Sequence, residues 1–226
     1  MTRLLLISSS NVYGYGFLDH AEAEIRRMLA GRSVAFIPFA QHDHEAHTLL
    51  VRERFARMGV KVTQIRDAGD VARAESIFIG GGNTFRLLKA LYDRELIDPL
   101  KQRICDQGVP YVGSSAGTNV ACPTIMTTND MPIVYPPTFT ALGLVSYQIN
   151  PHYLDADPQS THKGETREER IQQFHEENTA PVIGLREGTM LWVENGQTTL
   201  LGLMSARLFR RDQEPVEVEA GSVIAL

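Results

Sequence analysis

The feature that most constrains the fold is an alternation of short apolar runs with helix-like stretches through the first half of the chain. Short apolar runs bounded by turn residues predict buried strands, and the stretches between them have the periodicity of amphipathic helices. Such an alternation is typical of a parallel sheet with crossover helices on both faces. The predicted strands are Leu4–Ser8, Val34–Phe39, Val60–Ile65, Ser76–Ile79 and Val109–Val112, and the predicted helices are Phe17–Ala30, Ala46–Met58, Phe85–Tyr92 and Ile97–Asp106.

The second half of the chain has a different sequence pattern, because prolines occur repeatedly between Pro123 and Pro151. Proline cannot continue a helix or a central strand, so this stretch predicts loops with a functional role. A helix over Thr166–Glu176 and several short strands follow, with Asn195-Gly196 as a two-residue hairpin turn. The predicted strands are Val182–Leu185, Met190–Val193, Thr198–Leu201, Leu208–Arg210 and Val216–Val218.

Together these patterns predict an α/β protein with a doubly wound, mostly parallel sheet of the flavodoxin-like kind and a C-terminal β-hairpin region. One hydrophobic core can grow until the chain reaches roughly 250 residues. The chain has 226 residues, and its composition shows no tract that reads as a linker. We therefore expect a single domain over residues 1–226.

Charge and composition exclude several classes of partner. The net charge is −5, and basic residues form no cluster longer than pairs such as Arg26-Arg27. Nucleic acid and anionic lipid are therefore not expected to bind. The apolar run at Leu4–Ile7 is too short for a signal sequence, and no stretch is long enough to span a membrane. Two cysteines do not indicate a disulfide framework, so we expect a cytoplasmic protein.

The segment Gly113-Ser114-Ser115-Ala116-Gly117 matches the G-x-S-x-G pattern of a nucleophile elbow. It follows a predicted strand and precedes a helix that we expect to begin at Ala116. In such an elbow, small neighbours permit a sharp turn that exposes the serine hydroxyl at the carboxyl end of the sheet. We predict Ser115 as a nucleophile; the alternative is a serine that only caps the helix.

Backbone amides near Ser115 predict an oxyanion hole. The N–H of Ala116, at the start of the helix, is available to a developing negative charge. Gly80-Gly81-Gly82 ends another strand at the same edge of the sheet, and Gly82, or else Gly81, is the expected second donor. A nucleotide loop is the alternative for these glycines, but the Lys-Ser/Thr of a P-loop and the G-x-G-x-x-G spacing are both absent.

A serine nucleophile needs a base, and the chain has seven histidines. His152 follows a strand end and Pro151, which fixes a corner, so it is the predicted general base. The cluster His42–His47 lacks the H-E-x-x-H spacing of a zinc site, and we expect no metal. Two acids could orient the imidazole, Asp130 in the irregular segment and Glu187 after the strand Val182–Leu185, and both remain candidates.

At these residues the sequence resembles the peptidase E family of α-aspartyl dipeptidases over most of its length. The resemblance implies a fold related to class I glutamine amidotransferases, no metal or other cofactor, and cleavage of dipeptides that begin with aspartate. It supports Ser115 and His152 in these roles and matches both candidate acids. The sequence departs from the family pattern around Ser10–Gly16, at Gln41–His47 and in the C-terminal strands. The matching blocks are Phe36–Ala40, Gly80–Phe85, Ser115–Gly117, Ala121–Ile125, Thr127–Val134, Gln148–His152 and His162–Arg167.

A dipeptidase of this kind forms an acyl-enzyme on Ser115 and needs groups that bind the aspartate carboxylate and the free ammonium. We expect the protein to be a monomer or a homodimer. The alternatives are a related amidase or amidotransferase-like hydrolase, whose nucleophile would be a cysteine such as Cys122, and a non-catalytic small-molecule binding protein on the same fold. The residues expected to bind substrate are Asn83, His162, Lys163, Glu165 and Arg167.

Overall fold

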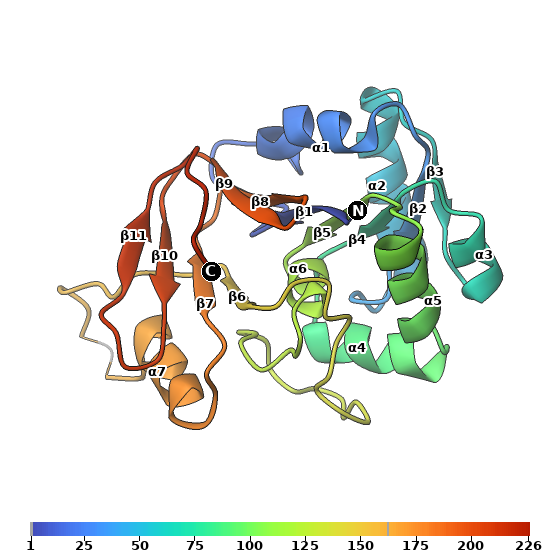
Figure 1. Cartoon of the computed structure of the whole chain (residues 1–226). Helices are drawn as coiled ribbons and strands as arrows, with labels where there is room; N and C mark the ends of the chain where they lie inside the picture. Colours follow the sequence, from blue (N-terminus) through green and yellow to red (C-terminus); the bar gives the residue numbers. More distant parts are fainter. Residues whose placement is uncertain (1, 162) are drawn as a thin grey trace.

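The computed structural model describes residues 2–161 and 163–226. Within these residues a seven-stranded sheet forms the centre, in the order β3-β2-β4-β5-β1-β8-β9 (Figure 1). Its first five members in this order pair in parallel, and β8 and β9 add an antiparallel hairpin beside β1. The strands are β1 (Arg3–Ile7), β2 (Val34–Ile37), β3 (Val62–Gln64), β4 (Ile77–Ile79), β5 (Tyr111–Ser114), β8 (Thr189–Glu194) and β9 (Gln197–Gly202).

Helices cover both faces of this sheet, because successive side chains of a buried strand point to opposite sides. Leu5 and Ile7 of β1 pack with α1 and α2, whereas Leu4 and Leu6 belong to the core beneath α4, α5 and α6. A 3-10 turn precedes α1 and a π-helical turn continues α5. The helices are α1 (Glu22–Leu29), α2 (His44–Arg57), α3 (Ala68–Ala72), α4 (Thr84–Asp93), α5 (Ile97–Lys101) and α6 (Ala116–Ala121), with the two turns at Asp19–Ala21 and Gln102–Asp106.

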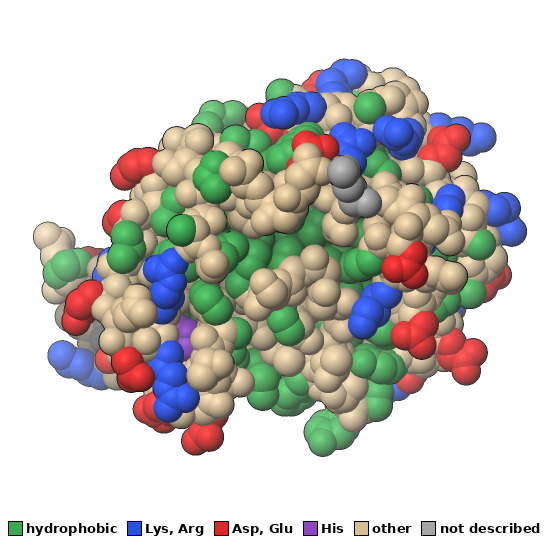
Figure 2. All heavy atoms as spheres, in the orientation of Figure 1, with side chains coloured by type: hydrophobic (Ala, Val, Ile, Leu, Met, Phe, Trp, Pro, Cys, Tyr) green, Lys and Arg blue, Asp and Glu red, His purple; other side chains and the backbone are tan. Residues whose placement is uncertain are grey.

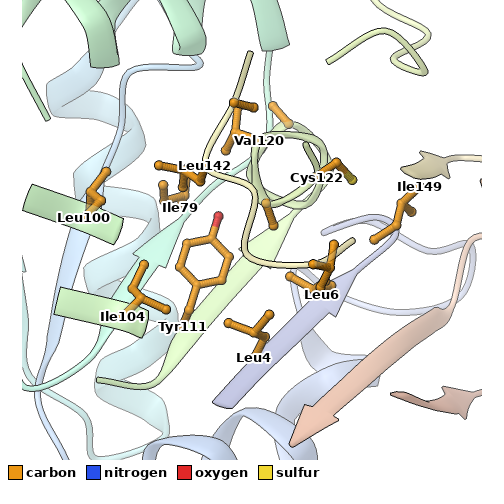
Figure 3. Packing of buried hydrophobic residues seen from close by; sticks show 14 of the residues in the cluster. Leu4, Leu6, Ile79, Leu100, Ile104, Tyr111, Val120, Cys122, Leu142 and Ile149 are labelled. Atoms are coloured by element: carbon orange, nitrogen blue, oxygen red, sulfur yellow. The ribbon is translucent and has the colours of Figure 1, made fainter. Parts of the chain in front are cut away.

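Tyr111 fixes the junction between β5 and α6. Its ring is fully buried and lies among Leu4, Ile79 and Ile104 (Figure 3). The phenol hydroxyl donates a hydrogen bond of 2.5 Å to the carbonyl of Gly117. A buried hydroxyl without a partner would cost the full free energy of its desolvation, so this bond holds the first turn of α6 against the strand.

A second, four-stranded sheet in the order β11-β10-β7-β6 stands beside the first (Figure 1). Its strands β6 and β7 are parallel, with Pro151 opposite Leu185, so the residues that follow them emerge together. The helix α7 (Arg167–Glu177) packs on this sheet through Ile171, against Val182 and Phe209. The strands are β6 (Gln148–Pro151), β7 (Val182–Leu185), β10 (Ala206–Phe209) and β11 (Val216–Val218).

The mostly parallel α/β architecture and the hairpin at Asn195-Gly196 are confirmed, both turn residues having positive φ. Two details differ. The first helix begins at Glu22 rather than Phe17, because Leu18 has a φ of 60° that no right-handed helix accepts. Part of the predicted C-terminal hairpin region pairs instead into the separate second sheet.

Acidic and basic side chains are interspersed around the face seen in Figure 2, and hydrophobic side chains are exposed toward its middle and lower edge. Among the described residues, no helix is long and apolar enough to cross a membrane.

Candidate active site

Ser115 lies at a sharp turn between β5 and α6. Its φ of 54° and ψ of −108° are unusual for a residue with a side chain, and its N–H donates to the carbonyl of Ile7 (3.0 Å). Flanking glycines permit the turn, since a Cβ on Gly117 would lie 2.1 Å from the carbonyl oxygen of Ile79. The Ser115 side chain makes no capping hydrogen bond to α6. The hydroxyl is therefore not occupied by a structural role at the helix end.

The structure brings Ser115, His152 and Glu187 into one hydrogen-bonded chain. Ser115 Oγ lies 2.8 Å from His152 Nε2, and His152 Nδ1 lies 2.8 Å from Glu187 Oε1. A carboxylate only accepts hydrogen bonds, so Nδ1 carries the proton and Nε2 is left as the acceptor for the serine hydroxyl. This is the geometry of a serine nucleophile with a general base and an orienting acid.

Asp130, the other acid predicted to orient His152, is engaged elsewhere. Its Oδ2 accepts hydrogen bonds from the backbone N–H and the hydroxyl of Thr84, at 2.7 and 2.6 Å. It thereby binds the first turn of α4, whereas Glu187 reaches His152 because β6 and β7 end side by side. The structure therefore places Glu187 within hydrogen-bond distance of His152, whereas Asp130 bonds Thr84.

Arg186 fixes the backbone next to Glu187. Its guanidinium is almost fully buried and pairs with Asp155 (2.7 Å) and Glu217 (2.8 Å), and it also donates to the carbonyl of Ser205. These hydrogen bonds hold the pKa of both carboxyl groups below their usual values. Arg186 thereby joins the end of β7 to the segment after His152 and to β11.

The predicted oxyanion donors lie around Ser115. Gly81 is so close that a Cβ on it would stand 3.2 Å from Ser115 Cβ, and Gly82 has a φ of 141° with a Cβ position blocked by Ala40. Glycine is favoured at 81 by the close approach to Ser115, and at 82 by the positive φ and the lack of space for a Cβ. Ala116 is the first residue of α6, where backbone N–H groups have no acceptor within the helix. Gly81 and Gly82 line the same cavity as Ser115, and Ala116 follows the nucleophile directly in the chain.

A cavity of about 690 Å³ opens over Ser115 and His152. Its wall opposite the nucleophile comes from the start of α2 and the loop before it, and Asp43 is the carboxylate in that wall. Neither lysine nor arginine is among the described residues that line it. The lining residues are Ser9, Ser10, Asn11, Phe17, Gln41, His42, Asp43, Ala46, His47, Leu50, Gly81, Gly82, Ser115 and His152.

Many of these lining residues were not predicted, although the sequence held a signal for them. Asn11, Gln41, His42, Asp43 and His47 fall in Ser10–Gly16 and Gln41–His47, two of the three places where the sequence departs from the peptidase E pattern. A segment that differs between relatives while the catalytic blocks stay the same is where substrate contacts can vary. The departures therefore marked the walls of the cavity.

Of the predicted substrate-binding residues, the four that the structure describes do not line this cavity. Asn83 caps α4, with Oδ1 accepting from the N–H of Arg86 (3.0 Å). Glu165 and Arg167 line a separate cavity of about 360 Å³, and burial together with the nearby Arg170 lowers the pKa of Arg167. Lys163 is exposed. His162 lies outside the described residues.

Histidines near the cavity do not form a metal site in the part of the chain that the structure describes, where no three His, Cys, Asp or Glu side chains are grouped. His47 is buried against Phe36 and Gly80, and burial lowers the pKa of its imidazole. His44 packs edge-on against Phe39. Of these two rings, His47 lines the cavity and His44 does not.

Cys122 gives a test of the alternative thiol nucleophile. It is fully buried at the end of α6, on the side toward Ile149 (Figure 3), and burial raises the pKa of its thiol to about 12. A thiol held in this state is unreactive. We expect iodoacetamide to leave hydrolysis unchanged while mass spectrometry detects modification of the partly exposed Cys105. Loss of activity in step with alkylation of Cys122 would contradict this assignment.

Comparisons with known proteins identify a matching family, similar sequences and a similar fold. The sequence model described as peptidase family S51 matches residues 4–201. Peptidase E of Streptomyces coelicolor is 52% identical over 97% of this chain and 92% of its own length. The "Probable alpha-aspartyl dipeptidase" of Drosophila melanogaster is 46% identical, with 92% of this chain and 90% of that protein covered. The crystal structure of a peptidase from an acI-B1 actinobacterium superposes with a TM-score of 0.71 at 17% identity, covering 100% of this chain and 97% of the other, which shows a common fold.

Proposed function

The chain belongs to peptidase family S51, and from that membership we propose that it hydrolyses dipeptides with an N-terminal aspartate through an acyl-enzyme on Ser115. The observation that carries the proposal is the hydrogen-bonded chain from Ser115 Oγ through His152 to Glu187 at the mouth of a cavity. A nucleophile, a base and an orienting acid in this order are the requirements of serine-based acyl transfer.

Acylation begins when His152 Nε2 takes the hydroxyl proton of Ser115 and Oγ attacks the peptide carbonyl carbon. The N–H groups of Ala116 and Gly82, with Gly81 as the alternative, stabilise the negative charge that develops on the carbonyl oxygen. The C–N bond then breaks, and the imidazolium gives its proton to the departing amine. An aspartyl ester of Ser115 remains.

Deacylation repeats these transfers with water. His152 takes a proton from a water molecule, the hydroxide oxygen attacks the ester carbonyl, and the same amides hold the oxyanion. The ester bond breaks and Ser115 Oγ recovers its proton from His152. Glu187 stays ionised throughout, holding the imidazole in the reactive tautomer and stabilising its positive charge.

The cavity suits a small substrate that carries both signs of charge. The Asp43 carboxylate can accept the substrate's free ammonium group, since it lines the cavity and only one of its oxygens is engaged, by the N–H of Ala46. The side-chain amide of Asn11 and the second N–H of Gln41, whose first donates to the carbonyl of Gly81, can donate to carboxylates, and His42 lines the same cavity. The previously expected Lys163 and Arg167 have no contact that supports them in this role.

The cellular setting that we propose is the cytoplasm, where the free thiols of Cys105 and Cys122 would remain reduced. The partner is a small peptide. A monomer or a homodimer is compatible with the interspersed surface charge in Figure 2.

We expect the purified protein to hydrolyse Asp-Leu at least about 100-fold faster than Ala-Leu, and faster than Glu-Leu, with no loss of rate in a chelator. A hydrogen bond to a charged group contributes about 1.5–3 kcal/mol, so loss of the aspartate carboxylate from its donors corresponds to a preference of about this order. Release of leucine is followed by chromatography at matched enzyme and substrate concentrations. Equal rates on all three would contradict aspartate specificity; no cleavage of any dipeptide would favour another amide substrate or a binding protein.

A further inference from the structure

The backbone at His152 is held in an unusual conformation. His152 has a φ of 53°, in the left-handed region that residues with side chains rarely occupy. Such a conformation costs about 1–3 kcal/mol and persists only where its surroundings determine it. The peptide unit that joins Pro151 to His152 is therefore the place to look for groups that hold the base.

Ser8 holds one end of this peptide unit. Its side chain is fully buried just beyond β1, where Oγ accepts a hydrogen bond from the N–H of His152 (3.0 Å) and donates one to the carbonyl of Leu185 (2.7 Å). Leu185 ends β7, two residues before Glu187. One hydroxyl thus connects the backbone of the base to the backbone that carries its orienting acid.

Asn129 holds the other end. Its Nδ2 donates a hydrogen bond of 2.7 Å to the carbonyl of Pro151, the second polar group of the same peptide unit. Asn150 fixes Asn129 in turn, since its Nδ2 donates to Asn129 Oδ1 (2.9 Å) and to the carbonyl of Thr127 (2.8 Å). The peptide plane is therefore pinned at both its N–H and its C=O by side chains from two distant segments.

We propose that Ser8 and Asn129 are positioning residues for catalysis, which act by fixing the orientation of the Pro151–His152 peptide; this inference rests on the proposed role of His152 as base. Rotation of that plane would move the imidazole away from Ser115 Oγ or from Glu187. Errors of about 1 Å in the placement of a reacting group can lower the rate by roughly 10²-fold. Neither side chain needs to touch the substrate to produce this effect.

The test compares Ser8→Ala and Asn129→Ala with matched variants far from the site. Ser76→Ala removes a buried hydroxyl that donates to the carbonyl of Ser33 (2.7 Å), and Asn178→Ala removes an amide that donates to the carbonyl of Phe174 (2.9 Å). We expect kcat for Asp-Leu to fall by roughly 10- to 100-fold in Ser8→Ala and Asn129→Ala, with KM within about 3-fold and little change in the controls. Ser8→Thr, which keeps the hydroxyl, should recover part of the loss.

Proton NMR supplies a readout that a purely structural role would not change. A proton shared between His152 Nδ1 and Glu187 gives a resonance far downfield, which we expect in the wild type and Ser76→Ala but shifted or absent in Ser8→Ala. Rates and spectra equal to those of the controls would overturn the proposal, as would losses explained entirely by a smaller folded fraction in thermal melts. Asn129 is only partly buried, so its variant keeps the test decisive if Ser8→Ala does not fold. Activity in Ser115→Ala would instead contradict the proposed function.

Discussion

Replacing Ser115 with alanine lowers kcat/KM for Asp-Leu by at least about 10⁴-fold, because no other group forms the acyl-enzyme. The substitution removes one hydroxyl whose hydrogen-bond partner is His152. It leaves the Cβ that the strained turn already accommodates, and no cap of α6 is lost. We therefore expect the melting temperature to stay within a few degrees of the wild type, since a substitution of this kind changes stability by about 1 kcal/mol.

The measurement is single-turnover and steady-state release of leucine from Asp-Leu, with circular dichroism as the check on folding. Ser114→Ala is a demanding control, because Ser114 is the adjacent serine and its hydroxyl bonds Ser10 (2.7 Å) rather than His152. Ser114→Ala should retain most activity. Substantial hydrolysis by a folded Ser115→Ala protein would mean that the nucleophile lies elsewhere.

Replacing Glu187 with glutamine lowers kcat by roughly 10³- to 10⁴-fold, the range seen when the acid of a serine triad becomes an amide. Glutamine has the size of glutamate but no charge to stabilise the imidazolium, and its NH₂ group can select the wrong tautomer of His152. Asp130→Asn is the matched change at the other acid that was predicted to orient His152. It should alter kcat by less than about 10-fold and instead lower the free energy of unfolding by about 1–3 kcal/mol, because Asp130 binds Thr84.

These two variants are compared by kcat and KM on Asp-Leu and by urea unfolding. A larger kcat loss in Asp130→Asn than in Glu187→Gln would reverse the assignment. Equal small losses would mean that His152 needs no ionised partner, and the hydrogen bond of 2.8 Å between His152 and Glu187 would then have another role.

Local patterns predicted most of the elements because the formation of a helix or strand depends largely on nearby residues. The strand β5 has glycine at 113 because a Cβ there would meet the carbonyl of Gly117 inside the G-x-S-x-G segment, and the strand at Val182–Leu185 is found where its apolar run lies. The pairing partner of a strand is not contained in its own periodicity. The pattern at Leu208–Arg210 therefore indicated a strand without revealing that it pairs with β7 in a second sheet.

The orienting acid illustrates the same limit. Asp130 lies in the irregular segment and Glu187 follows the strand Val182–Leu185, and the sequence alone did not decide between them. The choice depends on the parallel register that places Pro151 opposite Leu185, a long-range fact. The residues that contact the substrate were harder still to predict from the sequence, because Arg167 and Lys163 have a suitable charge but do not line the cavity at Ser115.

The position of β1 affects the order in which the protein can become active. The strand β1 lies between β5 and β8. The residue after it, Ser8, makes its hydrogen bonds to His152 and Leu185, which are synthesised much later. A nascent chain that has left the ribosome only as far as the G-x-S-x-G segment holds the serine but neither its base nor its acid. Contacts between distant residues also make folding slow relative to local pairing. The hydrogen-bonded chain of Ser115, His152 and Glu187 can therefore form only after the residues through Glu187 have been synthesised.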